Sequence, residues 1–326
     1  MMHKIIALLQ DGNTHSGVEL GSALGVTRSA VGKQISKLKE MGFQINCIKG
    51  SGYRLLIPFE QLDAQKITRH FVDAPAGFSP PVDVVWSTTS TNDYVMSAIR
   101  DGRITESGFV CLAEYQSAGR GRRGKSWVSP LGGGLCLSFA WRFERGAESL
   151  EGLSLSVAIA VVEVLENDFL IKNLKIKWPN DIFLDDKKLG GILIDVMGEA
   201  GGPCWVVVGV GLNVRNTQSV MYTVDQPWVD LYSGAGAVVP RNILAAKIIT
   251  KIAKKIIAHE RDGFSITNKE WSKYDAFFEK KVVVKMSESD IFYGVSRGIS
   301  TSGGLIVDVD GVQKTIKSGE VSLRRA

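Results

Sequence analysis

The sequence predicts an α+β chain of three parts, because the pattern of the chain changes twice along its length. Residues 1–60 hold three short helical patterns and two short strands, residues 61–275 alternate strands with helices, and residues 276–326 hold only short strands. A length of 326 residues and a hydrophobic fraction of 44% suit two or three domains with sizeable cores. We expect a winged helix-turn-helix, a central mixed sheet with helices on one face, and a small all-β barrel.

The first sixty residues have local signals for each element of a winged helix-turn-helix. His3–Gln10 is a short amphipathic helix, and Ser16 begins a second helix with Glu19 three residues later, a capping box. Thr27 caps a third helix, which Gly42 ends. Two strands, at 44–48 and 53–56, form a glycine-tipped hairpin that predicts the wing.

The third helix and the hairpin present side chains suited to DNA. Residues 1–57 hold seven basic and three acidic residues, so they carry +4 of the chain's formal +5. A small basic domain that binds protein instead is the alternative. We expect DNA contacts from Thr27, Arg28, Ser29, Lys33, Gln34, Lys37, Lys49 and Arg54.

The central region pairs strands through short turns, as an α+β sheet does, and does not have the pattern of a doubly wound parallel sheet. Its predicted helices are 92–100, 153–168, 241–261 and 269–278, after a short helix at 64–71. Its predicted strands are 82–86, 109–113, 135–141, 175–178, 182–184, 189–197 and 205–213. The last region predicts strands at 282–286, 291–298, 305–308, 313–316 and 321–323.

Composition excludes several classes of function. The four cysteines are far apart and form no C-x-x-C pair, which favours a reducing, cytoplasmic location over a disulfide framework. The four histidines are equally scattered, so we expect no dedicated metal site. The longest apolar run, 153–165, is too short to span a bilayer, and no membrane partner is expected.

The most unusual stretch is the basic loop Gly119–Gly124, which reads G-R-G-R-R-G. It matches the P-loop and dinucleotide-binding expressions by letter, but Pro130 and Gly132–Gly134 follow where both motifs need a helix. Glycine freedom and three guanidinium groups suit a loop that binds an anion. A solvated or nucleic-acid-binding loop is the alternative.

The order of polar motifs resembles the biotin–protein ligase family, in the bacterial form that has an N-terminal winged helix and also represses the biotin operon. The motifs are S-T-N, E-Y-Q with the basic loop, K-W-P-N-D, K-L-G-G-I-L and G-x-G-L-N, at 90–92, 114–124, 177–181, 188–193 and 209–213. The resemblance covers essentially the whole chain and implies a biotin/lipoate ligase-like central domain and an SH3-like C-terminal barrel.

The resemblance also implies roles for individual residues. Lys188 matches the family lysine at the junction of biotin carboxylate and phosphate, with Gly191 beside it. Arg120 is expected to be catalytic too, in the part of the loop that touches biotin or its adenylate, and Asp181 is a candidate proton acceptor. The implied biotin contacts are Ser90, Thr91, Asn92, Gln116, Gly119, Arg120, Gly121, Arg122, Lys188 and Gly191. The implied ATP or adenylate contacts are Arg122, Lys177, Asn180, Asp181, Asn213 and Trp228.

The implied reaction has two steps. Biotin and ATP form biotinyl-5′-adenylate, with Mg²⁺ arriving on the nucleotide and no protein cage for it. A lysine of the biotin carboxyl carrier protein then takes the biotin. The adenylate is also expected to promote a homodimer that binds operator DNA.

Two other functions stay open at this point. A transcription factor that senses a small ligand without catalysis would bind DNA but would not exchange pyrophosphate into ATP. A lipoate ligase would share the central fold but use lipoate in place of biotin. The intact basic loop and Lys188 disfavour the first, and the winged helix and K-W-P-N-D disfavour the second.

Overall fold

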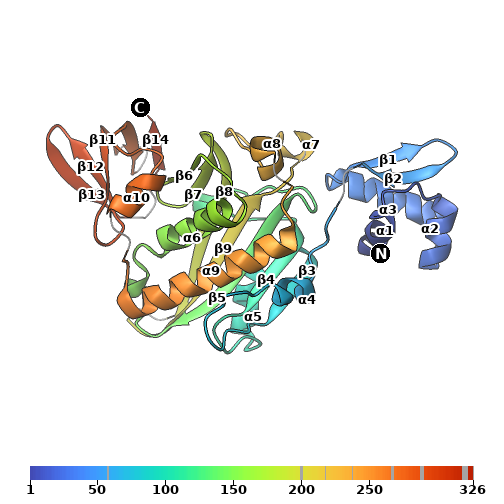
Figure 1. Cartoon of the computed structure of the whole chain (residues 1–326), viewed down its shortest axis with the longest axis horizontal. Coiled ribbons are helices and arrows are strands. Elements are labelled where there is room, and N and C mark those ends of the chain that lie inside the picture. The colour runs from blue at the N-terminus through green and yellow to red at the C-terminus, as the bar shows by residue number, and fades with distance from the viewer. Residues whose placement is uncertain are drawn as a thin grey trace.

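Three sheets organise the chain, and the largest lies between the other two (Figure 1). The computed structural model describes residues 1–56, 59–198, 201–216, 218–236, 238–265, 268–286, 290–317 and 322–325. The N-terminal helices and hairpin lie at one end of the long axis and the C-terminal strands at the other (Figure 1). Among the described residues, no helix combines the length and the apolar character needed to cross a bilayer.

The N-terminal elements form where their end signals predict. Ser16 Oγ accepts a hydrogen bond from Glu19 N, and the Glu19 carboxylate accepts one from Ser16 N, which confirms the capping box. Thr27 Oγ1 accepts from Ala30 N, and Gly25 ends a helix at a φ of 67°. The elements are α1 (Met2–Leu9), α2 (Gly17–Leu24), α3 (Arg28–Glu40), β1 (Ile45–Ile48) and β2 (Gly52–Leu55).

The central sheet has seven strands in the order β3-β4-β5-β9-β8-β7-β6. Only β3 and β4 run parallel, so the predicted mixed sheet is confirmed. The strands are β3 (Val82–Thr88), β4 (Val110–Gln116), β5 (Gly134–Phe143), β6 (Leu174–Lys177), β7 (Asp181–Leu184), β8 (Lys187–Gly198) and β9 (Cys204–Asn213). The helices of this region are α4 (Ala64–Arg69), α5 (Thr91–Arg100), α6 (Leu153–Asp168), α7 (Gln218–Met221), α8 (Leu231–Ala235), α9 (Arg241–Asp262) and α10 (Asn268–Tyr274), with short 3-10 turns at Arg122–Gly124 and Ala147–Leu150.

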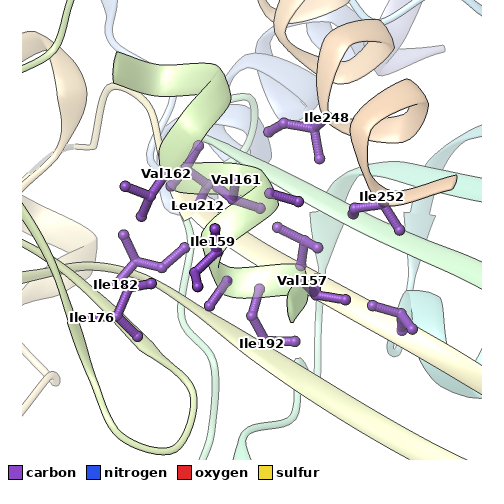
Figure 2. Close-up of a cluster of buried hydrophobic side chains, with 14 of the residues drawn as sticks. Val157, Ile159, Val161, Val162, Ile176, Ile182, Ile192, Leu212, Ile248 and Ile252 are labelled. Carbon is purple, nitrogen blue, oxygen red and sulfur yellow. The ribbon is translucent and has the colours of Figure 1, made fainter. Parts of the chain in front are cut away.

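Helices α6 and α9 cover one face of the sheet, as predicted. Their branched side chains meet those of β6, β7, β8 and β9, as the cluster around Val157, Ile192 and Ile248 shows (Figure 2). Burial of such side chains from water is the main stabilising term of the fold. Helix α5 packs on the opposite face, where Val95 and Ala98 contact Ala140 and other strand residues. That placement is a correction to the one-faced arrangement, because the apolar stripe of α5 fits either face of the sheet.

Helix α5 covers only part of its face and leaves the rest of that face beside β8 and β9 open for a site.

The C-terminal strands form an antiparallel sheet in the order β13-β12-β11-β10-β14, confirming five short strands. No pairing of described residues joins β13 to β14, so closure into a barrel is not a feature of the part described. The strands are β10 (Lys281–Lys285), β11 (Ile291–Ile299), β12 (Leu305–Val309), β13 (Val312–Ile316) and β14 (Ser322–Arg325). The predicted strand at 321–323 begins at a residue outside the described ranges.

Candidate active site

A cavity of about 780 Å³ lies where the basic loop crosses the open part of the central sheet. Its size suits a small molecule with a nucleotide attached. Of the residues predicted from the sequence, it is lined by Ser90, Thr91, Asn92, Gln116, Arg120, Gly121, Arg122, Lys177, Asn180, Asp181, Lys188, Gly191, Asn213 and Trp228. The structure therefore brings together residues that span 139 positions of the chain, from Ser90 to Trp228.

Glycines line the floor of the cavity at positions where neighbouring side chains leave no room for a Cβ atom. A Cβ on Gly209 would lie 2.4 Å from Asn92 Oδ1, and one on Gly211 would lie 2.6 Å from the Trp127 ring. Gly119 does not line the cavity, and a Cβ there would lie 2.5 Å from the carbonyl oxygen of Trp127. Its role as a biotin contact stays a prediction.

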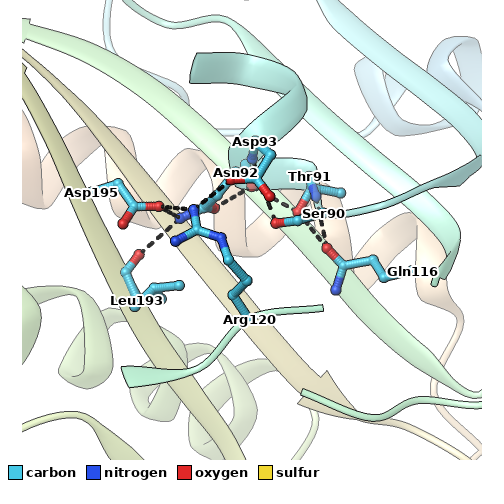
Figure 3. Close-up of polar contacts among 9 residues, drawn as sticks. Ser90, Thr91, Asn92, Asp93, Gln116, Arg120, Leu193 and Asp195 are labelled. Atoms are coloured by element: carbon cyan, nitrogen blue, oxygen red, sulfur yellow. Dashed lines mark hydrogen bonds and ion pairs between the residues drawn. The ribbon is translucent and has the colours of Figure 1, made fainter. Parts of the chain in front are cut away.

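A network of polar side chains lines one end of the cavity, at the start of α5 (Figure 3). Gln116 Oε1 accepts hydrogen bonds from Thr91 N at 2.7 Å and from Thr91 Oγ1 at 3.1 Å. Ser138 Oγ donates to Asn92 Oδ1 at 2.5 Å and lies 2.7 Å from Thr91 Oγ1. Ser90 Oγ caps the helix by accepting from Asp93 N. These donors and acceptors are held in place before any ligand arrives, as recognition of a small polar ring requires.

Lys188 and Asp181 form an ion pair at the centre of the cavity wall. The Lys188 Nζ to Asp181 Oδ1 distance is 2.8 Å, and the two side chains are only 16% and 17% exposed. The hairpin of β7 and β8 brings them together, because its tight turn passes through Asp185 and Asp186 at positive φ. Lys188 Nζ also lies 5.8 Å from the centroid of the Trp127 ring. A lysine held this way presents a fixed positive charge to an anionic ligand.

Further cationic and amide groups lie at the other end of the cavity. Arg122 Nη1 donates to Asn180 Oδ1 at 3.2 Å, and Asn180 Nδ2 donates to the carbonyl oxygen of Ile192 at 2.7 Å. Burial lowers the pKa of Arg122, while the charge of Asp181 acts in the opposite direction. Lys177 Nζ lies 5.7 Å from the centroid of the Phe183 ring. The tip of the basic loop is thus tied to the K-W-P-N-D turn.

Asn213 and Trp228 act together at the cavity mouth. Asn213 Nδ2 donates to the carbonyl oxygens of Val229 at 3.0 Å and Lys188 at 3.4 Å. These bonds hold the segment of Trp228 against the start of β8, where Lys188 and Trp228 form a parallel bridge. Asn213 Oδ1 is buried and has no hydrogen-bond partner among the described residues. Trp228 lines the cavity and can pack on a flat ring.

Arg120, which the sequence predicts as a catalytic residue, lines the cavity and pairs with two carboxylates. Its Nη2 lies 2.7 Å from Asp93 Oδ1 and 2.6 Å from Asp195 Oδ2 (Figure 3). No motif pointed to Asp93 or Asp195. The alternation of β8 could have found Asp195, since it lies on the same face as Gly191 and Leu193.

The predicted DNA-contacting residues are accessible on the winged helix. Lys33 and Lys37 lie on the exposed face of α3, while Val31, Ile35 and Leu38 are buried beneath them. Also exposed are Thr27, Arg28, Ser29, Lys49 and Arg54, while Gln34 is half-buried. Thr27 is also the cap of α3, so its side chain has a structural use as well.

The described residues contain no group of three or more histidine, cysteine, aspartate or glutamate side chains placed to hold a metal ion. All four cysteines are free thiols, and burial raises the pKa of Cys111 and that of Cys136, the latter to about 12. No cysteine of this chain is therefore a thiolate nucleophile at neutral pH in the cavity.

Comparison with known proteins agrees with the geometry. Residues 84–213 match the Biotin/lipoate A/B protein ligase family, residues 2–54 an HTH domain and residues 277–324 the Biotin protein ligase C terminal domain. The chain is similar to a solved biotin protein ligase from Aquifex aeolicus in complex with biotin and ATP. The TM-score is 0.64 at 24% identity, covering 76% of this chain and 99% of that one, which supports the fold.

Full-length relatives show the family. The chain is 40% identical over 322 residues to the bifunctional ligase/repressor BirA of Salmonella typhimurium, covering 99% of this chain and 97% of the relative. It is 38% identical to that of Escherichia coli over 323 residues, with 99% and 97% covered. This chain therefore belongs to the bifunctional ligase/repressor family of biotin–protein ligases.

Proposed function

We infer that this chain is an ATP-dependent biotin–protein ligase that also binds DNA as a repressor. The observation that carries the inference is the cavity in which Lys188, Arg122 and the polar start of α5 face one space. One end suits the ureido ring of biotin, and the cationic end suits phosphate. Two relatives, 40% and 38% identical to this chain over nearly its full length, are named bifunctional ligase/repressor.

The first step joins biotin to AMP. A biotin carboxylate oxygen attacks the α-phosphorus of ATP, the bond to the β-phosphate breaks, and pyrophosphate leaves. Lys188 neutralises charge where carboxylate and phosphate meet, and Arg122 does so on the nucleotide side. Positioning and charge neutralisation of this kind supply most of the catalysis in phosphoryl and nucleotidyl transfer. Trp228 packs on the adenine, and Asn213 holds the Trp228 segment in place through its hydrogen bond to Val229.

The second step transfers biotin to a carrier protein. The amine of one lysine on a biotin carboxyl carrier protein attacks the carbonyl carbon of the adenylate. An amide forms and AMP leaves. That lysine must first lose a proton from a pKa near 10.4. Asp181 is our candidate acceptor, since it lies at the cavity wall with its carboxylate on Lys188.

Mg²⁺ enters as part of the nucleotide substrate. Asp181 is the carboxylate among the predicted nucleotide contacts, and it is engaged by Lys188. The ion would arrive on the phosphates, keep most of its water ligands and help to neutralise the phosphate charge. This fits an active site whose own residues supply cations and amides.

Repression requires two copies of the winged helix, and β8 offers a place for them to meet. Strand β8 pairs with β7 only from Lys187 to Gly191 and continues to Gly198. On that side, the described residues place no strand beside its second half, where Val196 is 45% exposed. Unpaired strand edges favour pairing with another chain. We propose a homodimer through this edge, promoted by the adenylate and positioned to bind operator DNA.

Mass spectrometry tests the ligase directly. The protein, biotin, Mg-ATP and a carrier domain are mixed, and the carrier is expected to gain the mass of one biotinyl group. A carrier that gains nothing while the protein still binds DNA would favour a non-catalytic ligand sensor. A gain with lipoate but not with biotin would favour a lipoate ligase. Sedimentation with and without adenylate tests the dimer, and an unchanged molecular mass would exclude that coupling.

A further inference from the structure

One side chain of the basic loop reaches two carboxylates outside it. Arg120 Nη2 contacts Asp93 on α5 and Asp195 on β8, at 2.7 and 2.6 Å. Figure 3 shows the guanidinium lying between these two elements, beside the polar network at the start of α5. The loop is therefore joined by ion pairs to both elements that border one end of the cavity.

The two carboxylates are themselves held in place. Asn92 Nδ2 donates to Asp195 Oδ2 at 2.9 Å, and Asn92 Oδ1 accepts from Ser138. Asp195 is fixed in the middle of β8, opposite Val207 of β9. Asp93 lies in the first turn of α5, where the helix dipole favours a negative charge. The anchor for Arg120 is thus part of the rigid sheet and helix, and only the loop is free to leave it.

The loop is built as a small hairpin, so one tie can hold all of it. Trp127 N donates to the carbonyl oxygen of Gly119 at 2.8 Å, and Gly121 N donates to that of Lys125 at 2.7 Å. Arg120 also bridges to Ser126 across the hairpin. A guanidinium fixed on one strand of this hairpin fixes the backbone of the other.

We propose that Arg120 is the latch that keeps the basic loop closed over the acyl-adenylate, with Asp93 and Asp195 as its positioning residues. The inference rests on the proposed ligase function and assigns Arg120 a role other than charge neutralisation at phosphate. When the loop opens, two carboxylates lose the cation between them, and this favours closure. Closure excludes water and foreign amines from an activated carbonyl.

The latch should be sensitive to salt. The three side chains are 40%, 46% and 20% exposed, so solvent and ions reach the contacts. Exposed pairs of this kind contribute modestly, and two of them together correspond to about a tenfold change in the fraction of open loop. Added salt should weaken them within the range that screens surface charges.

The experiment uses the full chain with both carboxylates replaced by isosteric amides, Asp93→Asn with Asp195→Asn. Preformed adenylate is followed as it leaves the protein, and its capture by free hydroxylamine is measured beside it. We expect release and capture to rise about tenfold at low salt. The turnover rate of biotin-dependent pyrophosphate exchange should change less than threefold. In added salt the wild type should approach the variant.

A matched control is Asp101→Asn, which removes the carboxylate from an exposed pair with Arg103 on the far end of α5. It should keep the wild-type release rate. Arg120→Ala alone and combined with Asp195→Asn completes a cycle, and the combined variant should release no faster than Arg120→Ala. Additive effects, or an unchanged release rate in the double amide variant, would overturn the latch.

Trypsin cleavage between Gly119 and Gly124 without any ligand separates the latch from the ligase. The amide variant should be cut faster than the wild type at low salt if the loop is latched. Equal cutting rates would count against the latch even in a protein that forms adenylate. If the wild type forms no adenylate but is still cut more slowly than the amide variant, the proposed ligase function is wrong and the latch stands.

Discussion

At the scale of the residue, the site depends on charges that are paired before substrate binds. Lys188 is held by Asp181 at 2.8 Å and lies beside the Trp127 ring, so its ammonium group has few alternative positions. A charge fixed in advance stabilises a developing negative charge without reorganisation during the reaction. In our proposals the two loop arginines have separate roles, Arg122 at the nucleotide and Arg120 in holding the loop closed.

Replacing Lys188 tests that reasoning. Lys188→Ala should lower the turnover rate of biotin-dependent pyrophosphate exchange into ATP by about 100-fold or more, the effect of losing one preorganised charge. Lys187→Ala is a matched control, since Lys187 is the exposed neighbour on the same strand and should leave exchange within about twofold. Exchange at the wild-type rate in Lys188→Ala would remove this residue from the mechanism.

His259 makes stability depend on pH. Its Nε2 donates to the carbonyl oxygen of Ser149 at 2.8 Å, and its Nδ1 is buried without a partner among the described residues. Burial lowers the pKa of His259 from its ordinary value of 6.5. The unfolded chain therefore takes up this proton at higher pH than the folded chain, and stability falls as pH drops below 6.5.

Urea unfolding at pH 7 and pH 5 measures that dependence. The wild type should lose on the order of 1 kcal/mol more than His259→Gln over this range, because one group contributes at most about 1.4 kcal/mol per pH unit. His70→Gln replaces an exposed histidine and should keep the full wild-type loss. Identical pH dependence in His259→Gln and the wild type would contradict the assignment.

At the scale of the element, the start of α9 ties the segment after the winged helix to the central sheet. Arg241 Nη2 lies 2.8 Å from Glu114 Oε2 on β4, and the two side chains are 5% and 1% exposed. Arg241 also donates to the carbonyl oxygen of Glu60, and Glu114 Oε1 accepts from Leu62 N at 2.6 Å. Phe59 lies under the guanidinium, 5.0 Å from ring centroid to Cζ. This connecting segment is therefore an integral part of the core.

Breaking that pair should be costly. Arg241→Ala leaves the Glu114 carboxylate buried without its cation, and we expect a loss of about 3 kcal/mol of unfolding free energy. Lys247→Ala removes a cation from the same helix, but its pair with Asp168 is 37% and 32% exposed. That control should cost less than about 1 kcal/mol. Similar losses in the two variants, measured by chemical denaturation, would show that burial does not govern this pair.

At the scale of the whole molecule, a basic DNA-binding unit and a ligase cavity lie in one chain. The turn after the basic loop contacts the N-terminal unit, because Leu131 N donates to the carbonyl oxygen of Met41 at 2.9 Å and Leu131 packs in that core. The basic loop is thus separated along the chain by only a few residues from a contact with the winged helix. The proposed dimer edge of β8 lies on the same sheet. The cavity, this proposed edge and the predicted DNA surface are therefore connected through neighbouring backbone.

The affinity for DNA should depend on the exposed charges of α3, which lie outside the cavity. Lys33→Ala with Lys37→Ala removes two exposed charges from α3, so the affinity for operator DNA should fall and the salt slope should decrease by about two. Fluorescence anisotropy at several salt concentrations measures both. The control is Lys4→Ala with Lys39→Ala, which removes two charges outside the predicted contact set. It should bind operator DNA more tightly than the variant with Lys33→Ala and Lys37→Ala. Equal losses in both pairs would mean that net charge, and not the predicted contact residues of α3, carries recognition.

Local sequence signals were enough to predict most of the elements and most of the residues that line the cavity. Capping residues, glycines and periodicity are local signals, so the helices and strands that were predicted begin and end within a few residues of their predicted positions, whereas the short helices α7 and α8 were missed. The polar motifs also pointed to the cavity, since all the predicted ligand residues except Gly119 line it. Each motif is short enough to be recognised without knowing what lies opposite it.

The way in which these elements face one another could not be predicted from the sequence, because it depends on contacts between distant parts of the chain. Asp93, Ser138 and Asp195 belong to no motif, and their roles follow from the pairing of β8 with β9 and the packing of α5 on the strands. The face that α5 covers is likewise set by packing. Arg120 shows the reason most clearly, because its sequence context indicates an anion site while its nearest anions come from 27 residues before it and 75 residues after it. Contacts over such separations depend on the fold as a whole.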